Sequence, residues 1–321
     1  MSVPLHYTLF RSESKQAALF LMVHGMTSAG LTFHNVAARI AAQANVHVVC
    51  VDLRGHGSSP DAPRIQDYSL TAMALDIADL LGTLKDKEGV YDAAGPFAKV
   101  HLLGHSWGSR VVFALAQSRP DLVASLLIED EYIGPAHRVE GKDEDEGTVV
   151  ARSQAMLEQY QPHFPSFNEA EAFFMRTTGP GVCDFSRKIL EEQGNPGEVD
   201  GQGNPIGAKR YRVLFKPHVT HVWDYHCRVA TVGDEVWKDC RKFPMPMHVM
   251  KAGDAQDSDI SASTWEEITA QAKELEAEAE GVVRSTSVVA EAAHPIHRSH
   301  PEEFVAQTVG FLQRCSIAAP A

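Results

Sequence analysis

Residues 100–117 of the 321-residue chain have the sequence VHLLGHSWGSRVVFALAQ. The first part is a short apolar run that favours a buried strand. The second part places apolar side chains at three- and four-residue spacings, which favours a helix. Between them stands Gly104-His105-Ser106-Trp107-Gly108, a G-x-S-x-G pentapeptide at a strand-to-helix junction. The pattern predicts a sharp turn that presents the Ser106 hydroxyl as a nucleophile.

The two glycines of the pentapeptide have a physical reason. A serine in this turn has a strained backbone, at a cost of about 1–3 kcal/mol, and a side chain at either glycine would collide with neighbouring backbone. The turn also places the Trp107 N–H at the start of the helix, where unpaired amides and the helix dipole favour negative charge. We expect this N–H to be one donor of an oxyanion hole. The second expected donor is the Met26 N–H, because Gly25 lets the chain turn sharply after the apolar run AALFLMVHG.

The rest of the chain alternates short apolar runs with segments of helical periodicity, which is typical of a parallel sheet covered by helices. Strands are expected at 5–11, 17–24, 46–53, 98–104, 123–130, 246–253 and 282–290, and helices at 32–43, 69–87, 107–118 and 301–315. The prediction is an α/β fold with a doubly wound, mostly parallel sheet. Its core would comprise residues 1–130 and 244–321. The intervening residues 131–243 show helical patterns at 150–160 and 166–177, and we expect them to form a helical cap, or lid, over the sheet.

A serine nucleophile needs a base, and in the order Ser, acid, His this base lies beyond the last strand. Three histidines occur there, in the stretch HPIHRSHPEEF at 294–304. His294 is preferred because it is nearest to the strand end, where side chains meet the nucleophile's edge of the sheet. His297 and His300 are its competitors, and Pro301 is expected to begin the final helix.

Composition and charge exclude several classes of function. The chain has 29 basic and 42 acidic residues, a net charge of −13, which disfavours binding to nucleic acid or to anionic membranes. The apolar runs are far shorter than the roughly 20 residues of a membrane span, and the N-terminal residues lack the features of a signal peptide. We therefore expect a cytoplasmic protein. The five scattered cysteines predict free thiols, with Cys50 a small apolar residue of a buried strand.

Two further clusters of polar residues invite a catalytic or metal-binding role. In DLRGHGSS at 52–59, the glycines indicate a tight turn, and Asp52 and Arg54 are expected to hydrogen-bond backbone there. In the insert, His218, His221, Asp224 and His226 are candidate ligands of a metal ion. We expect them to line a pocket instead, because the surrounding sequence lacks the further features of a metal site. No nucleotide-binding or metalloprotease motif occurs in the sequence, so no cofactor and no metal are predicted.

The stretches HGM at 24–26, DLRGHGSS at 52–59, GHSWGS at 104–109 and HPIHRSHPEEF at 294–304 resemble the α/β-hydrolase superfamily in content and order. The resemblance covers about residues 1–130 and 244–315, and it implies serine-hydrolase chemistry without specifying a substrate. The segment 131–243 resembles the family's inserted cap. The loop HGMTS differs from the HGGPG of proline iminopeptidases, which argues against peptide cleavage. A serine at the turn also differs from the aspartate of epoxide hydrolases and haloalkane dehalogenases, so those reactions are not expected.

The resemblance implies a triad acid after the strand PMHVMKAG, but the loop that follows lacks the family's Gly-x-x-Asp spacing. Three aspartates compete in it. Asp254 follows the strand too closely and Asp259 begins the approach to the next helix, so Asp257 is preferred. Asp130 is the alternative, because it ends the strand VASLLIED and some α/β-hydrolases supply the acid from that strand.

The function predicted from these residues is hydrolysis of a small carboxylic ester by Ser106, His294 and Asp257 or Asp130, with the Met26 and Trp107 amides holding the oxyanion. Thioesterase, lactonase and carbon–carbon bond hydrolase activities would use the same residues and stay open. A ligand-sensing receptor on the same fold is the non-enzymatic alternative. The sequence does not specify the physiological substrate or the oligomeric state.

Overall fold

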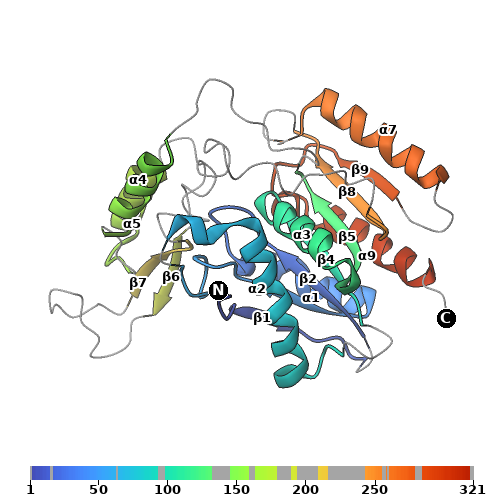
Figure 1. Ribbon diagram of the computed structural model, residues 1–321, viewed down its shortest axis with the longest axis horizontal. Helices are drawn as coiled ribbons and strands as arrows, with labels where there is room; N and C mark the ends of the chain where they lie inside the picture. Colours follow the sequence, from blue (N-terminus) through green and yellow to red (C-terminus); the bar gives the residue numbers. More distant parts are fainter. Residues whose placement is uncertain are drawn as a thin grey trace.

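The computed structural model describes residues 2–14, 17–62, 64–92, 98–131, 145–158, 163–178, 189–193, 209–215, 243–254, 258, 260–278 and 284–318. Figure 1 shows them as one large sheet with helices on both sides and a smaller group of elements, α4, α5, β6 and β7, at one end.

The large sheet has seven strands, in the order β1 (Tyr7–Phe10), β3 (Val46–Val51), β2 (Ala18–Val23), β4 (Val100–His105), β5 (Val123–Glu129), β8 (Met247–Ala252) and β9 (Arg284–Val289). The β1 strand runs antiparallel to β3, and all other neighbours are parallel. The predicted α/β class with a mostly parallel sheet is therefore confirmed. Parallel strands buried on both faces have nearly continuous apolar sequences, which is why they could be predicted.

Helices cover the two faces of the sheet, with α1 (His34–Ala44) and α9 (Pro301–Ala318) on one and α2 (Leu70–Thr83) and α3 (Trp107–Ser118) on the other (Figure 1). The pleat of β2 shows the division, because Phe20 and Met22 pack in the cluster of α1 and α9, while Leu19 and Leu21 pack in that of α2 and α3. The other helices of the core are the short turns Gly30–Phe33, Ile65–Tyr68, Leu84–Glu88 and Pro120–Leu122, then α7 (Ala262–Glu278) and α8 (Ile296–Ser299).

The described part of the insert contains α4 (Glu146–Glu158), α5 (Phe167–Thr178), β6 (Ile189–Gln193) and β7 (Lys209–Val213). The two helices agree with the prediction, but the sequence analysis missed β6 and β7, which pair antiparallel in a separate sheet. Their sequences, ILEEQ and KRYRV, carry too many charges for an apolar alternation to show. Cross-strand ion pairs hold them instead, such as Arg212 with Glu192 at 2.8 Å.

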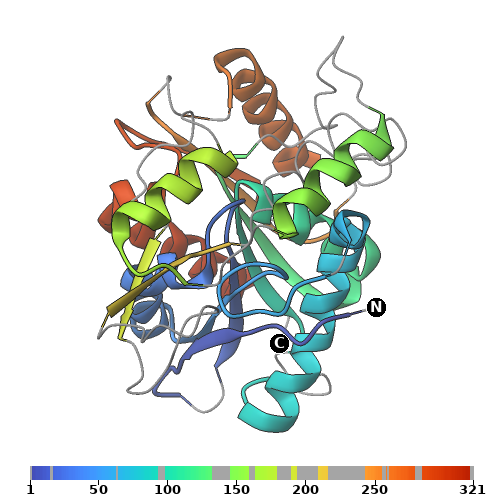
Figure 2. The same ribbon diagram turned by 90° about the vertical axis from the view of Figure 1, so that its left-hand side faces the viewer.

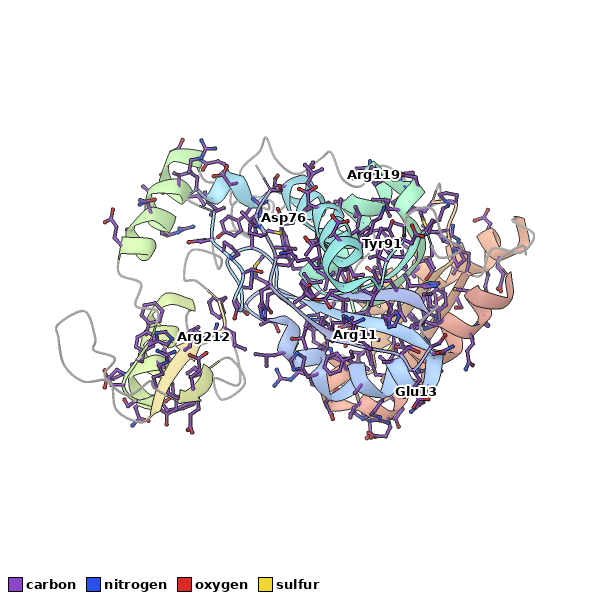
Figure 3. The ribbon with its side chains drawn as sticks, turned by 90° about the horizontal axis from the view of Figure 1, so that it is seen from below. Arg11, Glu13, Asp76, Tyr91, Arg119 and Arg212 are labelled. Carbon is purple, nitrogen blue, oxygen red and sulfur yellow. The ribbon has the colours of Figure 1, made fainter. Side chains whose placement is uncertain are left out.

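The described elements of the insert face the viewer in Figure 2. They are attached to the core at the turn that follows β3. The Gly57 N–H donates to the carbonyl oxygen of Leu214 at 2.8 Å. Arg212, which is labelled in Figure 3, donates from Nη1 to the carbonyl oxygen of Gly57 at 2.7 Å. Phe215 also forms a β-bridge with His56. The strand pair of the insert therefore docks on the turn 54–58.

The turn itself has the structural role predicted for it. The Asp52 carboxylate accepts the Gly30 N–H at 2.7 Å and the Ser58 N–H at 2.9 Å. A side chain at Gly57, whose φ is +53°, would place its Cβ 2.1 Å from that carboxylate. Arg54 is buried on Asp76 at 2.7 Å and also donates to the carbonyl oxygen of Asp67.

The buried thiol of Cys50 also agrees with its prediction, and burial raises its pKa. Among the described residues, none of the helices is long and apolar enough to cross a membrane.

Candidate active site

The turn between β4 and α3 has the strained geometry that the pentapeptide predicts. Ser106 has φ 48° and ψ −123°, in a region that L-residues rarely adopt. A Cβ at Gly104 would lie 2.4 Å from the Ser109 backbone, and one at Gly108 would lie 2.2 Å from the Val23 carbonyl oxygen. The two glycines are therefore required by close backbone approach, as expected.

His294 lies in the loop after β9 and next to this turn. Its ring packs against that of His105, the neighbour of Ser106 in the chain, with 4.7 Å between ring centroids. Its Nδ1 lies 2.8 Å from Oδ2 of Asp130. The His294 side chain is 21% exposed and the Asp130 side chain is fully buried. The structure thus brings together the predicted base and the aspartate that the sequence analysis kept as the alternative acid.

Asp130 is held in place from its other side. Its Oδ1 accepts the Ala252 N–H at 2.9 Å and the Ser258 hydroxyl at 2.7 Å. Lys251 in turn donates from Nζ to Ser258 Oγ at 3.2 Å. Burial alone would raise the pKa of the Asp130 carboxyl, but the hydrogen bonds that it accepts outweigh burial and leave its pKa below the ordinary value. Asp130 is therefore a carboxylate at neutral pH.

The remaining candidates for the acid have different positions. Asp257, the preferred one, lies outside the described residues, as does Asp259. Asp254 lies two residues beyond the end of β8, and its backbone N–H donates to the Ala292 carbonyl oxygen at 3.0 Å.

The competing histidines also have other partners. His297 is buried on Glu129, with Nδ1 2.8 Å from Oε1. His300 lies beside Ser299, with Nδ1 3.2 Å from the hydroxyl oxygen.

The loop after β2 packs directly on the serine turn. A Cβ at Gly25 would lie 2.9 Å from His105 Nδ1 and 3.2 Å from Ser106 Cβ. Met26, which follows, is partly buried against the core cluster of α2 and α3, and Trp107 is buried as the first residue of α3. The two residues predicted to donate backbone N–H groups therefore lie in segments that adjoin Ser106.

His24 fixes the orientation of the peptide before Met26. Its Nε2 lies 3.0 Å from the Leu53 nitrogen, which can only donate, so Nε2 is the acceptor. The proton is then on Nδ1, which donates to the Gly25 carbonyl oxygen at 2.8 Å. In a trans peptide the N–H points opposite to the carbonyl oxygen. The Met26 N–H consequently points away from the His24 ring.

Backbone strain is concentrated in the loops of this site. Five described non-glycine residues have a positive φ. Four of them, Thr27, Ser106, Asp130 and Glu291, lie in the loops of the site, and the fifth is Asn45. Such conformations cost about 1–3 kcal/mol each and are retained where the surrounding structure imposes them. Their grouping around one point, and not over the whole molecule, marks that point as the candidate functional site.

Three residues of the site were not predicted from the sequence, namely His24, Glu129 and Ser258. The adjacent pair Glu129-Asp130 at a strand end was a usable signal, because two neighbouring carboxylates at the buried end of a parallel strand need two partners.

The possible metal ligands of the insert, His218, His221, Asp224 and His226, lie outside the described residues. The described residues contain no group of side chains suited to a metal ion.

Known proteins similar to this chain share its fold and parts of its sequence. The sn-1-specific diacylglycerol lipase ABHD11 of Mus musculus is 30% identical over 162 residues, which are 50% of this chain and 47% of that protein. Lipase LipV of Mycobacterium tuberculosis is 34% identical over 117 residues, 36% of this chain and 38% of that protein. The chain thus matches about half or less of the length of these relatives.

A solved structure, a marine microorganism esterase, superposes with a TM-score of 0.62 at 18% identity, covering 97% of this chain and all of that one, which shows a shared fold. The sequence model of the alpha/beta hydrolase family matches residues 20–307. With the fold, the strained serine and the histidine–aspartate pair beside it, this match shows that the chain belongs to the alpha/beta hydrolase family.

Proposed function

We propose that this protein is a serine hydrolase that cleaves a small carboxylic ester through an acyl-enzyme. Ser106 is the nucleophile, His294 the general base and acid, and Asp130 the carboxylate that orients His294. The Met26 and Trp107 N–H groups hold the oxyanion. This proposal transfers the acid from Asp257, the residue that the sequence favours, to Asp130.

The observation that carries the proposal is the hydrogen bond between His294 Nδ1 and Asp130 Oδ2, 2.8 Å long and adjacent to the serine turn. Because the ionised carboxylate only accepts, the Nδ1 proton stays on the ring and the Nε2 lone pair is available to take a proton. This is the tautomer that a serine nucleophile requires. The full burial of Asp130 against the partial exposure of His294 supports the same roles.

The reaction follows from these positions. Ser106 Oγ bonds to the carbonyl carbon while its proton passes to His294 Nε2. Collapse of the tetrahedral intermediate breaks the bond to the alcohol, which leaves with that proton. A water molecule then gives a proton to the same nitrogen and attacks the acyl carbon. The bond between the acyl carbon and Ser106 Oγ breaks, the proton passes from His294 to Ser106 Oγ, and the carboxylic acid leaves. The His24 contact supports the oxyanion role of Met26, because it directs that N–H away from the buried ring.

The test of the nucleophile is labelling with a fluorophosphonate, followed by peptide mapping, together with hydrolysis of a panel of acyl esters, thioesters and lactones. We expect one labelled serine, Ser106, and turnover of esters. Ser106→Ala should abolish labelling and lower kcat by about 10⁶-fold. Labelling that persists in Ser106→Ala would contradict the proposal, and tight stoichiometric binding without turnover would favour the receptor.

We further propose that the segment 131–243 is a lid that selects the size of the substrate. Its docking on the turn 54–58 supports this role, because His56 in that turn packs on His24 with 4.8 Å between ring centroids. The lid thus contacts His56, which packs on the residue that orients the oxyanion loop. Substitution of Phe174 in α5 or of Trp223, which lies outside the described residues, should shift the preferred acyl-chain length. Unchanged selectivity after apolar substitutions throughout the insert would contradict this role.

A further inference from the structure

Glu129, the last residue of β5, contacts two parts of the site at once. Its carbonyl oxygen accepts the Ser106 N–H at 3.1 Å. Its carboxylate accepts from His297 twice at Oε1, from the backbone N–H and from Nδ1, each at 2.8 Å. Asp130 is the next residue in the chain. One residue therefore joins the serine turn, the acid and the segment that carries His294.

The Glu129–His297 pair is closed to solvent. The Glu129 side chain is fully buried and that of His297 is 2% exposed. A carboxylate without partners would be costly at this depth, whereas hydrogen bonds from two N–H groups compensate its desolvation. The ring of His297 packs against Phe33 at 4.4 Å and Phe304 at 5.8 Å between centroids. These contacts fix His297 and deny it access to a substrate.

The Glu129–His297 pair is connected to His294 in two ways, through the short chain segment between the two histidines and through the ring of His105, which contacts both. Only Pro295 and Ile296 separate the two histidines, and proline restricts the backbone between them. The Ile296 N–H donates to the His294 carbonyl oxygen at 3.1 Å. The ring of His105 packs against both histidines, at 4.7 Å from His294 and 5.2 Å from His297.

We propose that Glu129 and His297 are positioning residues that hold the His294 loop on the end of β5, at the height where His294 reaches both Asp130 and Ser106. The proposal rests on the function proposed above, because it needs His294 as the base. Its physical content is preorganisation, since a displacement of about 1 Å from the reacting geometry can cost 10²-fold in rate.

The test compares Glu129→Ala and His297→Ala with the wild type and with His297→Asn, whose side-chain amide can replace the Nδ1–H donor. The readouts are the rate of fluorophosphonate labelling per reactive Ser106, and kcat and KM for an ester. We expect both alanine variants to lose about 10²-fold in labelling rate and kcat with KM little changed. His297→Asn should recover much of the rate. The double alanine variant should lose no more labelling rate and kcat than either single variant, because each single variant already removes the contact between Glu129 and His297.

A purely structural role predicts a different result. The stoichiometry of labelling would fall and the thermal midpoint would drop, while the rate per reactive serine stayed at the wild-type value. That outcome would overturn the inference alone. A wild-type protein that the fluorophosphonate does not label at Ser106 would overturn the proposed function, and the inference with it.

If an alanine variant does not fold, Glu129→Gln and Glu129→Asp replace it. Glutamine keeps the length and an oxygen acceptor, whereas aspartate keeps the charge but is one methylene shorter. Positioning predicts that the glutamine variant is the faster of the two. The opposite order would overturn the inference.

Discussion

Two histidine–carboxylate pairs lie side by side in this molecule, built from consecutive residues of one strand end and from two histidines three positions apart. In each pair, Nδ1 lies 2.8 Å from a carboxylate oxygen. They differ in exposure, because the side chain of His294 is 21% exposed and that of His297 is 2% exposed. Under the roles proposed above, the accessible pair exchanges a proton with the substrate, whereas the enclosed pair holds the chain.

A third group of histidines shows what burial does when the partners are hydroxyls. His101 contacts Ser125 Oγ at 2.7 Å, and His248 contacts Ser285 Oγ at 2.8 Å. Burial lowers the pKa of both to about 4. These rings are neutral at pH 7, and they lie within the sheet rather than at its functional end.

The largest expected effect separates the two pairs. His294→Ala should lower kcat by about 10⁶-fold, as loss of a triad histidine does elsewhere, because no other group takes the serine proton. His297→Ala should lose only about 10²-fold, because it displaces the base without removing it. Steady-state kinetics on one ester measures both. Equal losses of kcat in the two variants would contradict the proposal that His294 transfers protons while His297 only positions the loop.

A smaller effect is expected at His24, a buried histidine that holds a peptide instead of a carboxylate. His24→Phe removes the contact that orients the Gly25–Met26 peptide and should lower kcat by about 10²–10³-fold, the usual cost of one oxyanion donor. The control is His6→Phe, since the His6 side chain is 49% exposed and contacts the Asp52 carboxylate instead of the Gly25–Met26 peptide. Full activity in His24→Phe would remove Met26 from the oxyanion hole.

The smallest effect is on stability, and it tests the third group. In the unfolded chain His101 and His248 take up protons near pH 6.5, whereas in the folded protein they do so near pH 4. The free energy of unfolding should therefore fall as the pH drops from 6.5 to 4, by up to about 3 kcal/mol for each histidine. Urea unfolding at several pH values measures it, and His101→Gln or His248→Gln should flatten the curve. An unchanged slope in both variants would contradict this origin.

Asp130 affects stability in a different pH range. Its pKa is lowered in the folded protein, so its stabilising contribution is complete above about pH 3.9 and is lost as the pH falls through its folded pKa. Asp130→Asn should therefore leave the slope between pH 6.5 and 4 nearly unchanged.

The sequence predicts most of the fold because the inner strands of the large sheet are buried and parallel. Their apolar runs end within a few residues of the observed strands, as in 46–53 for Val46–Val51 and 123–130 for Val123–Glu129. The strands β6 and β7 could not be found in this way, since charged residues interrupt their apolar positions and pair across the two strands.

In the candidate site, too, some residues could be predicted from the sequence and others could not. Ser106 and His294 could be proposed from the sequence because local motifs carry them, a glycine-flanked turn and a histidine after the last strand. The acid has no such motif, because its position depends on how two distant segments meet, 164 residues apart for Asp130 and His294. The Glu129–His297 pair is equally non-local, and only packing shows which histidine is enclosed.

We have proposed that Asp130 orients the base. This role is tested directly by measuring kcat for Asp130→Asn beside Asp257→Asn, with folding checked by circular dichroism. The amide keeps the shape of the side chain but favours the wrong imidazole tautomer, which lowers kcat by roughly 10⁴-fold in a triad. We predict that loss in Asp130→Asn and near-wild-type activity in Asp257→Asn. The reverse pattern, full activity in Asp130→Asn and collapse in Asp257→Asn, would contradict the account.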